Sequence, residues 1–217
     1  APEPLGSMMK DLIERRLADP TLPMEEAFSQ QLKEEKLELP AGQFALFMNS
    51  MYAVDAYVRD YFRKAALDAL LAEKLPVTVF GEGWEKYSCG DEHSLRREPA
   101  VPFALSFERI TKAHVLLNVS PIFNRGMHDR VPAGMANHAV VLTDENPYLR
   151  RTFTGGKELL FYSLEKPDTL CEQAERTLTD VRLREKIAAS AYETFEREYT
   201  WKRRAEQILA FAEEVEA

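Results

Sequence analysis

The chain has 217 residues, a length that fits one domain with an appendage or two very small domains. Hydrophobic residues make up 45% of it and charged residues 29%, which allows a sizeable core and disfavours intrinsic disorder as the dominant state. Twenty-eight Lys and Arg residues against 36 Asp and Glu give a formal net charge of −8, so the chain as a whole repels phosphate polymers. We therefore expect no nucleic-acid partner.

The cysteine usage indicates a reducing setting. Cys89 and Cys171 are too few for a disulfide framework and too far apart for a metal knuckle, so we expect a cytoplasmic protein. The longest apolar stretches fall short of the roughly 18 to 20 residues that cross a bilayer, and no transmembrane segment is expected. Residues 1–7 resemble a cloning scar and are expected to lie outside the fold, in a natural polypeptide longer than this one.

Residues 8–74 are predicted to form a helical N-terminal segment, because apolar positions recur every three or four residues. Prolines divide it into two shorter helices, 8–18 and 24–36, and one long amphipathic helix, 42–73. Periodicity alone also allows a short buried strand at 44–48. The polar side of the long helix carries Asp55, Arg59, Asp60, Arg63 and Lys64.

Residues 75–217 are predicted to form an α/β domain with a parallel sheet, because short β-branched or apolar runs alternate with helix-like stretches. The predicted strands are 76–80, 113–119, 139–143 and 159–162, with a weaker fifth near 99–103. The predicted crossover helices are 103–112, 129–137, 147–153 and 167–178. Residues 181–216 are expected to form two further helices, the second capped by Thr200.

Ligands of open parallel sheets bind outside the carboxyl ends of the strands, so the loops that follow strands are the candidate sites. Gly81-Glu82-Gly83-Trp84 follows the first strand, and its glycines permit a tight turn and a close backbone approach to a ligand. Lys86 stands where a dinucleotide fingerprint has its third glycine, which disfavours a nicotinamide or flavin site. Two interpretations of this loop remain open: it contacts a ligand, or it is a simple turn on which Trp84 packs.

The loop after the second of these strands, residues 120–130, is richer in polar groups. Two arginines beside a helix N-terminus suit a diphosphate, because guanidinium groups bind phosphate oxygens in pairs and the helix end adds partial positive charge. The carboxylate before the helix is able to bind sugar hydroxyls, to pair with an arginine or simply to cap the helix. The histidine either contacts the ligand or is satisfied within the turn. The candidate residues are Asn124, Arg125, His128, Asp129 and Arg130.

Thr143 and Asp144 end the next strand and are candidates for a wall of the same pocket, although helix capping explains much of the composition of 143–146. The turn at 155–158 lacks the spacing of a Walker phosphate loop. The four histidines show no paired metal-ligand spacing, and no acyl-transfer signature is present. Metal-dependent hydrolysis and acyl transfer are therefore disfavoured.

An ordered set of short motifs resembles the C-terminal half of bacterial family-1-type glycosyltransferases, and more narrowly the branch related to the spore maturation protein CgeB. The resemblance covers residues 55–209. The motifs are VTVFGEGW at 77–84, AHVLLN at 113–118, GMHDR at 126–130, VLTD at 141–144, ELLFY at 158–162 and YTWKR at 199–203.

The resemblance implies a GT-B enzyme, in which two Rossmann-like domains face each other and the C-terminal one binds the nucleotide-sugar donor without a metal. It implies that Gly81 to Trp84 lie against the donor, that Arg125 and Arg130 balance the diphosphate, and that His128 orients sugar or phosphate. Asp129, Thr143 and Asp144 would bind hydroxyls. Residues 201–212 would form the helix that crosses back to the other domain.

Two departures from the family pattern set the alternatives. Ala133 stands where many relatives carry the glutamate that holds the donor ribose, so Asp129 or Asp144 would have to substitute. A short helical segment stands where the family has a full acceptor-binding domain, which usually supplies the catalytic base. We therefore expect a donor-binding fragment of a larger transferase with an unknown acceptor. A non-catalytic interaction module with a degenerate nucleotide site and an epimerase of the same fold remain open.

Overall fold

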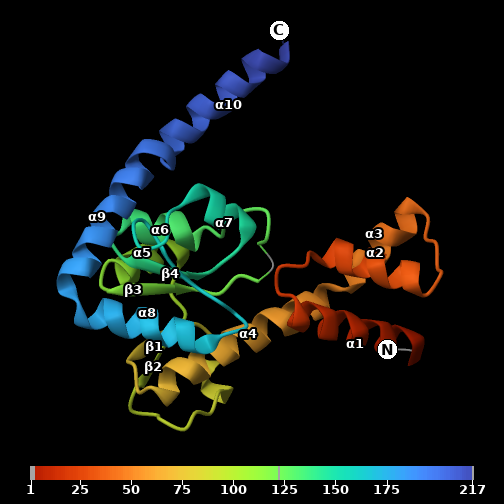
Figure 1. Cartoon of the computed structure of the whole chain (residues 1–217), viewed down its shortest axis with the longest axis horizontal. Helices are drawn as coiled ribbons and strands as arrows, with labels where there is room; N and C mark the ends of the chain where they lie inside the picture. The colour runs from red at the N-terminus through yellow and green to blue at the C-terminus, as the bar shows by residue number, and fades with distance from the viewer. Residues whose placement is uncertain (1–2, 122, 217) are drawn as a thin grey trace.

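The computed structural model describes residues 3–121 and 123–216. Residues 1–2, Ile122 within the predicted loop 120–130, and Ala217 lie outside the described residues. A helical part at the N-terminal end adjoins an α/β body, and the last helix projects from the opposite side of that body (Figure 1).

The helical part contains α1 (Glu3–Ala18), α2 (Met24–Glu34), α3 (Ala41–Ser50) and α4 (Tyr52–Ala72). Residues 3–7, which were expected to lie outside the fold, are helical and form the start of α1. The predicted single helix 42–73 is wrong. Met51 separates two helices because its ψ of 1° turns the chain away from helical geometry, and its backbone N–H is shared between the carbonyls of Phe47 and Met48. Residues 44–48, the alternative strand, are helical.

Every strand pairing among the described residues is parallel, which confirms the predicted α/β class. β1 (Val77–Phe80) pairs with β2 (Leu95–Glu98), and β4 (Val140–Asp144) pairs with β3 (Val115–Asn118) on one side and with β5 (Leu160–Tyr162) on the other. Hydrogen bonds thus divide the strands into groups of two and three. The weaker strand predicted near 99–103 is misplaced: β2 ends at Glu98, and Pro102 starts α5 (Phe103–Ile110).

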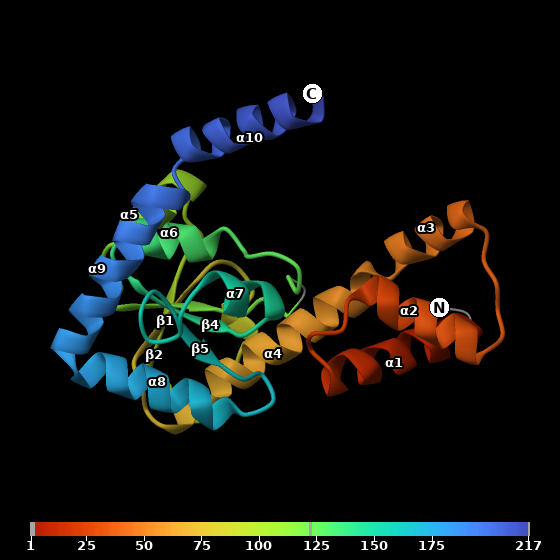
Figure 2. The ribbon, with the colours of Figure 1, turned by 45° about the horizontal axis from the view of Figure 1, so that its top comes forward.

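Helices cover both faces of the three-stranded group, as the alternating side chains of β4 show. Val140 and Leu142 belong to a core that includes residues of α4 and α8 (Pro167–Thr179). Val141, between them, belongs to a second core with residues of three other helices. These are α6 (Arg130–Ala136), α7 (Pro147–Thr152) and α9 (Val181–Glu198), which Figure 2 shows on the other side of the strands from α4 and α8.

The approach of α6 to the strands depends on Gly134. A Cβ atom at this position would lie 2.4 Å from Cγ2 of Val141 and 3.0 Å from Cδ2 of Leu116. Only glycine lets the helix backbone come this close to β3 and β4. The position of Gly134 therefore sets the height of α6, and with it the height of Arg130, above the sheet.

The helical part and the α/β body share one continuous core. Buried Leu12 and Phe28 belong to the same cluster as Phe62 of α4 and Leu160 of β5. Figures 1 and 2 both show α4 running from the helical part along the α/β body. This continuity holds α1 and α2 next to the loop that follows β3.

The C-terminal helix α10 (Trp201–Glu216) begins as predicted, with the Thr200 hydroxyl accepting a hydrogen bond from the Arg203 backbone N–H at 3.3 Å. Its large apolar side chains are exposed, including Trp201 at 90% and Phe211 at 67%. Within the described residues, none of the helices has the length and apolar character needed to cross a membrane.

Candidate functional site

A buried polar network lies at the carboxyl ends of β3 and β4. Asn118 donates through Nδ2 to Thr143 Oγ1 at 3.0 Å, and the Ser120 backbone N–H donates to Asp144 Oδ1 at 2.7 Å. The Ser120 hydroxyl donates to Asn118 Oδ1 at 3.0 Å, and the Tyr162 hydroxyl donates to the Asn118 backbone carbonyl at 3.2 Å. These hydrogen bonds give the buried polar side chains partners and fix the orientation of Asn118.

Arg130, the first residue of α6, is anchored to this network. Its Nη1 donates to Asn118 Oδ1 at 2.9 Å. Burial is the main cause that lowers the pKa of Arg130, while the carboxylates of Asp129 and Asp144 act in the opposite direction. A guanidinium always keeps its proton in proteins, so the site holds a partly buried, fixed positive charge.

Two arginines of α4 add to this charge. Burial lowers the pKa of Arg63, and the positive charges of Arg130 and Arg59 lower it further, so the three guanidinium groups lie within electrostatic range of one another. Asp60 is the acidic partner of both α4 arginines, with ion-pair contacts of 3.7 Å to Arg59 and 3.8 Å to Arg63. We call Arg59, Arg63 and Arg130 the arginine cluster.

The cluster is incompletely neutralised. Arg59 Nε is buried and has no hydrogen-bond partner among the residues that the structure describes. Asp60 is 70% exposed, so water screens its charge. Asp129, next to Arg130, is 67% exposed and is screened in the same way. The three guanidinium groups repel one another, and an anion placed among them relieves that repulsion.

Asp144 does not neutralise the cluster fully either. Burial raises the pKa of its carboxyl to about 7, against the lowering effects of the Ser120 backbone N–H and the Arg130 charge. The carboxyl is therefore largely protonated below neutral pH. Its side chain is 2% exposed, so it lies beneath the site surface and positions Ser120. Thr143, another candidate for a hydroxyl contact, is 0% exposed and supports Asn118 in the same way.

His128 and Asp129 form the rim next to Arg130. Burial and the Arg130 charge lower the pKa of His128, which favours the neutral imidazole. Its Nδ1 accepts a hydrogen bond from the Arg130 backbone N–H at 3.2 Å, and the Asp129 carboxylate lies beside the same nitrogen. The Asp129 side chain forms no capping hydrogen bond to α6 in the described structure and is 67% exposed. Of the two carboxylates considered in place of the ribose glutamate, Asp129 is the exposed one.

The side chains of Arg125 and Asn124 lie next to the helical part. Arg125 forms an ion pair with Glu26 of α2, so its partner is not the N-terminal end of α6. Asn124 is buried, and its Nδ2 has no hydrogen-bond partner in the described part of the chain. Contact of Arg125 with a diphosphate stays a prediction, and in this structure its ion-pair partner is Glu26.

The Gly81–Trp84 loop has the geometry of the simple turn. Gly81 and Gly83 have φ angles of 121° and 91°, which glycine adopts without strain. Trp84 Nε1 donates to the Phe80 carbonyl at 3.2 Å, and its ring packs edge-on against Tyr87. Throughout the described residues, the hydrogen bonds of this loop stay within residues 80–98. Contact of Gly81, Glu82, Gly83 or Trp84 with a ligand stays a prediction.

The sequence analysis did not identify Arg59 and Arg63 as candidate site residues. They lie on the face of the long helix that was identified as polar, and their spacing of four places both on one side of it. That spacing is a usable signal, but a charged helix face more often faces solvent. Asn118, which orients Arg130, was also missed; it is a polar residue at the end of an otherwise apolar strand.

The chain belongs to the glycosyl transferase-like family, whose model matches residues 59–210. The matched range includes all three members of the arginine cluster and both groups of parallel strands, β1 to β5. The curated proteins include no match to this sequence.

Solved structures share the fold. The structure of Anabaena Alr3699/HepE in complex with UDP-glucose has a TM-score of 0.58 and 11% sequence identity, over 71% of this chain and 44% of that chain. The complexes of the same protein with UDP, and with UDP and glucose, each have a TM-score of 0.57 at the same identity and coverage. The likeness supports the fold predicted from the motifs, and the chain spans less than half the length of that protein.

Proposed function

We propose that this chain is the donor-binding part of a glycosyltransferase that moves a sugar from a nucleotide sugar to an acceptor. The observation that carries the proposal is the arginine cluster at the carboxyl ends of parallel strands, where ligands of such sheets bind. A diphosphate supplies the negative charge that this cluster lacks. Support also comes from Anabaena Alr3699/HepE, which shares the fold and whose structures contain UDP-glucose and UDP.

The chemical contribution of the cluster is to stabilise the leaving group. When the glycosidic bond to the donor phosphate breaks, the departing nucleoside diphosphate gains negative charge. Fixed guanidinium groups in a partly buried site stabilise that charge without reorganisation. We propose that they do so without a metal ion, with Arg130 held in place by Asn118. Asp129 is the proposed contact for donor hydroxyls.

The acceptor and the catalytic base belong to a larger enzyme in this proposal. The chain covers 44% of the length of Anabaena Alr3699/HepE, which fits a C-terminal donor domain whose partner domain is elsewhere in the polypeptide. The order of the motifs supports placement in the bacterial CgeB-like branch. The free thiols of Cys89 and Cys171 support a cytoplasmic enzyme.

Calorimetric titration with a panel of nucleoside diphosphates, UDP first, tests the proposal. The expected result is saturable binding of one base that the Arg130→Gln variant weakens by a factor of ten or more, the cost of one charge-assisted hydrogen bond. Arg150→Gln is the matched control, because Arg150 is exposed and pairs with Glu145 outside the cluster. Absence of binding in both this chain and its parent enzyme would contradict the proposal.

A non-catalytic interaction module is the second candidate. Ala133 at the position of the ribose glutamate and the exposed apolar side chains of α10 favour it. In that case no nucleoside diphosphate binds, and the protein forms a defined oligomer that size-exclusion chromatography with light scattering detects. A nucleotide that binds through Arg130 excludes this alternative.

A further inference from the structure

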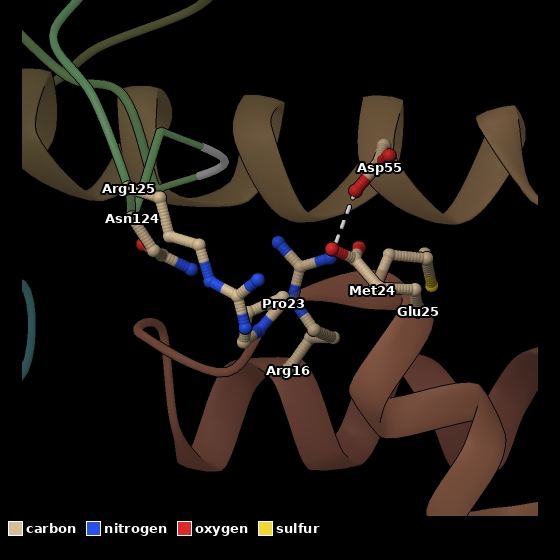
Figure 3. A pocket seen from close by; sticks show the side chains of 7 residues that line it. All are labelled: Arg16, Pro23, Met24, Glu25, Asp55, Asn124 and Arg125. Atoms are coloured by element: carbon tan, nitrogen blue, oxygen red, sulfur yellow. Dashed lines mark hydrogen bonds and ion pairs between the residues drawn. The ribbon is translucent and has the colours of Figure 1, made fainter.

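A cavity of about 160 Å³ lies between the helical part and the loop after β3, separate in composition from the arginine cluster. Its walls come from four segments of the chain that only the tertiary fold brings together. Arg16 of α1 and Asp55 of α4 form one side, Met24 and Glu25 of α2 another, and Asn124 and Arg125 of the loop the third (Figure 3). Arg16, Met24, Glu25 and Asp55 precede the residues matched by the family model, which begin at Arg59.

The cavity contains two buried hydrogen-bond donors without partners. The Arg16 side chain is 1% exposed, and its Nη1 donates to Asp55 Oδ1 at 2.8 Å, but its Nε has no partner among the described residues. Asn124 is 9% exposed, and its Nδ2 is likewise unpartnered within that part of the structure. A buried unsatisfied donor costs roughly 1–3 kcal/mol, so two in one cavity call for an acceptor there.

The cavity lining carries two arginines, Arg16 and Arg125, and two carboxylates, Glu25 and Asp55, so its formal charge is balanced. The two unpartnered donors, rather than net charge, favour a ligand oxygen on the side of the cavity formed by the loop. In Figure 3 the Arg16 guanidinium stands between Asp55 on one side and Asn124 and Arg125 on the other. Asp55 therefore compensates Arg16 from the far side. Arg125 is 74% exposed, so its guanidinium is able to leave Glu26 and close over a bound group at little cost.

We propose that this cavity binds an oxyanion, the carboxylate or phosphate group of a small molecule. One oxygen accepts from Arg16 Nε and another from Asn124 Nδ2, while Arg125 supplies the long-range attraction. The volume holds such a group together with a few water molecules, each of which takes about 30 Å³. Because the cavity adjoins the loop that leads to Arg130, the anionic group belongs to the acceptor of the transfer; that role rests on the proposed function, whereas the binding does not.

The test follows the Arg16 Nε–Hε and Asn124 Nδ2–H₂ signals by ¹⁵N NMR during separate titrations with inorganic phosphate and with glucuronate. The expected result is a saturable shift of both signals with at least one of the two anions. A shift with phosphate alone assigns the site to phosphate groups, and one with glucuronate alone assigns it to carboxylates. A purely structural Arg16–Asp55 pair gives no saturable shift with either anion, and that result overturns the proposal.

Two variants separate this cavity from the arginine cluster. Asn124→Asp keeps the size of the side chain but replaces a donor by a negative charge, so anion binding should weaken by a factor of about ten or more. Its backbone amide spectrum away from the cavity should match that of the unaltered protein. Arg130→Gln should leave the shifts at Arg16 unchanged. Shifts that vanish in Arg130→Gln and persist in Asn124→Asp would place the anion at the cluster and overturn the proposal, whatever the outcome of the nucleotide titration.

Discussion

Arg130 Nη1 donates a hydrogen bond to Asn118 Oδ1 at 2.9 Å, which joins the first turn of α6 to the last residue of β3. Asn118 is itself held by Thr143 and Ser120, so the guanidinium is fixed before any ligand arrives. Preorganised positive charge of this kind is what a departing diphosphate requires.

Replacement of Asn118 tests whether this anchoring matters. Asn118→Ala removes the acceptor for Arg130 and leaves the Thr143 hydroxyl without its donor, so the arginine becomes mobile and nucleoside diphosphate affinity should fall by a factor of about ten. Calorimetry measures the affinity, and circular dichroism verifies that the variant is folded. An unchanged affinity in a folded variant would show that Arg130 needs no support from β3.

Replacement of Arg63 tests whether α4 contributes to nucleoside diphosphate binding. Arg63→Gln removes one cluster charge from a half-buried position and should weaken nucleoside diphosphate binding by a factor of about ten or more. Lys64→Gln, on the next residue of α4, is the matched control because Lys64 is exposed and pairs with Asp68. Equal effects of the two variants would mean that general surface charge, and not the cluster, attracts the ligand.

The buried carboxyl of Asp144 should make stability depend on pH. Its pKa is raised to about 7 in the folded protein from the ordinary 3.8, so the folded state binds the proton more tightly than the unfolded state. The resulting stabilisation is complete below about pH 4 and is lost as the pH rises toward 7, which amounts to about 4 kcal/mol. Asp144→Asn keeps an oxygen that accepts from the Ser120 backbone N–H and has no such proton to lose.

Urea unfolding of both proteins between about pH 4 and pH 8 measures this effect. The difference in unfolding free energy between Asp144→Asn and the unaltered protein should move in favour of the variant as the pH rises. A difference that stays constant across this range would show that Asp144 has the same pKa in the folded and unfolded states.

Gly134 should be intolerant of a side chain. Gly134→Ala places a methyl group 2.4 Å from Cγ2 of Val141, so α6 must shift away from the sheet, at a cost of about 1–3 kcal/mol. Gly42→Ala in α3 is the control, because nothing lies within 4 Å of its added Cβ, and it should stabilise the protein by about 0.5 kcal/mol. Thermal unfolding of the two variants compares them, and equal midpoints would contradict the close packing of α6.

The regular elements were predictable where one physical signal dominates. The apolar runs of β4 and the proline at the start of α7 place those elements within a residue or two. The break between α3 and α4 at Met51 was not predictable from the sequence. The apolar stripe continues through it, and a single ψ angle near 0° leaves no mark on the composition. The position of β2 was missed since Leu95–Glu98 contains one apolar residue only.

The sequence was enough to place the loop after β3 at the edge of the sheet. It was not enough to identify the side chains that the loop residues contact. His128, Asp129 and Arg130 follow a strand and precede a helix, which was enough to place them at the sheet edge. The pairing of Arg125 with Glu26 joins residues 99 positions apart and depends on how α2 packs. Arg59 and Arg63 come within electrostatic range of Arg130 only through the path of α4, which no local pattern encodes.

The most direct test of the account is a calorimetric titration of nucleoside diphosphates into this protein and into its Arg130→Gln variant. We expect saturable binding with a preference for one base, weakened by a factor of ten or more in the variant, while Arg150→Gln binds like the unaltered protein. Binding that is equal in all three proteins would contradict it, because the arginine cluster would then have no part in holding the diphosphate.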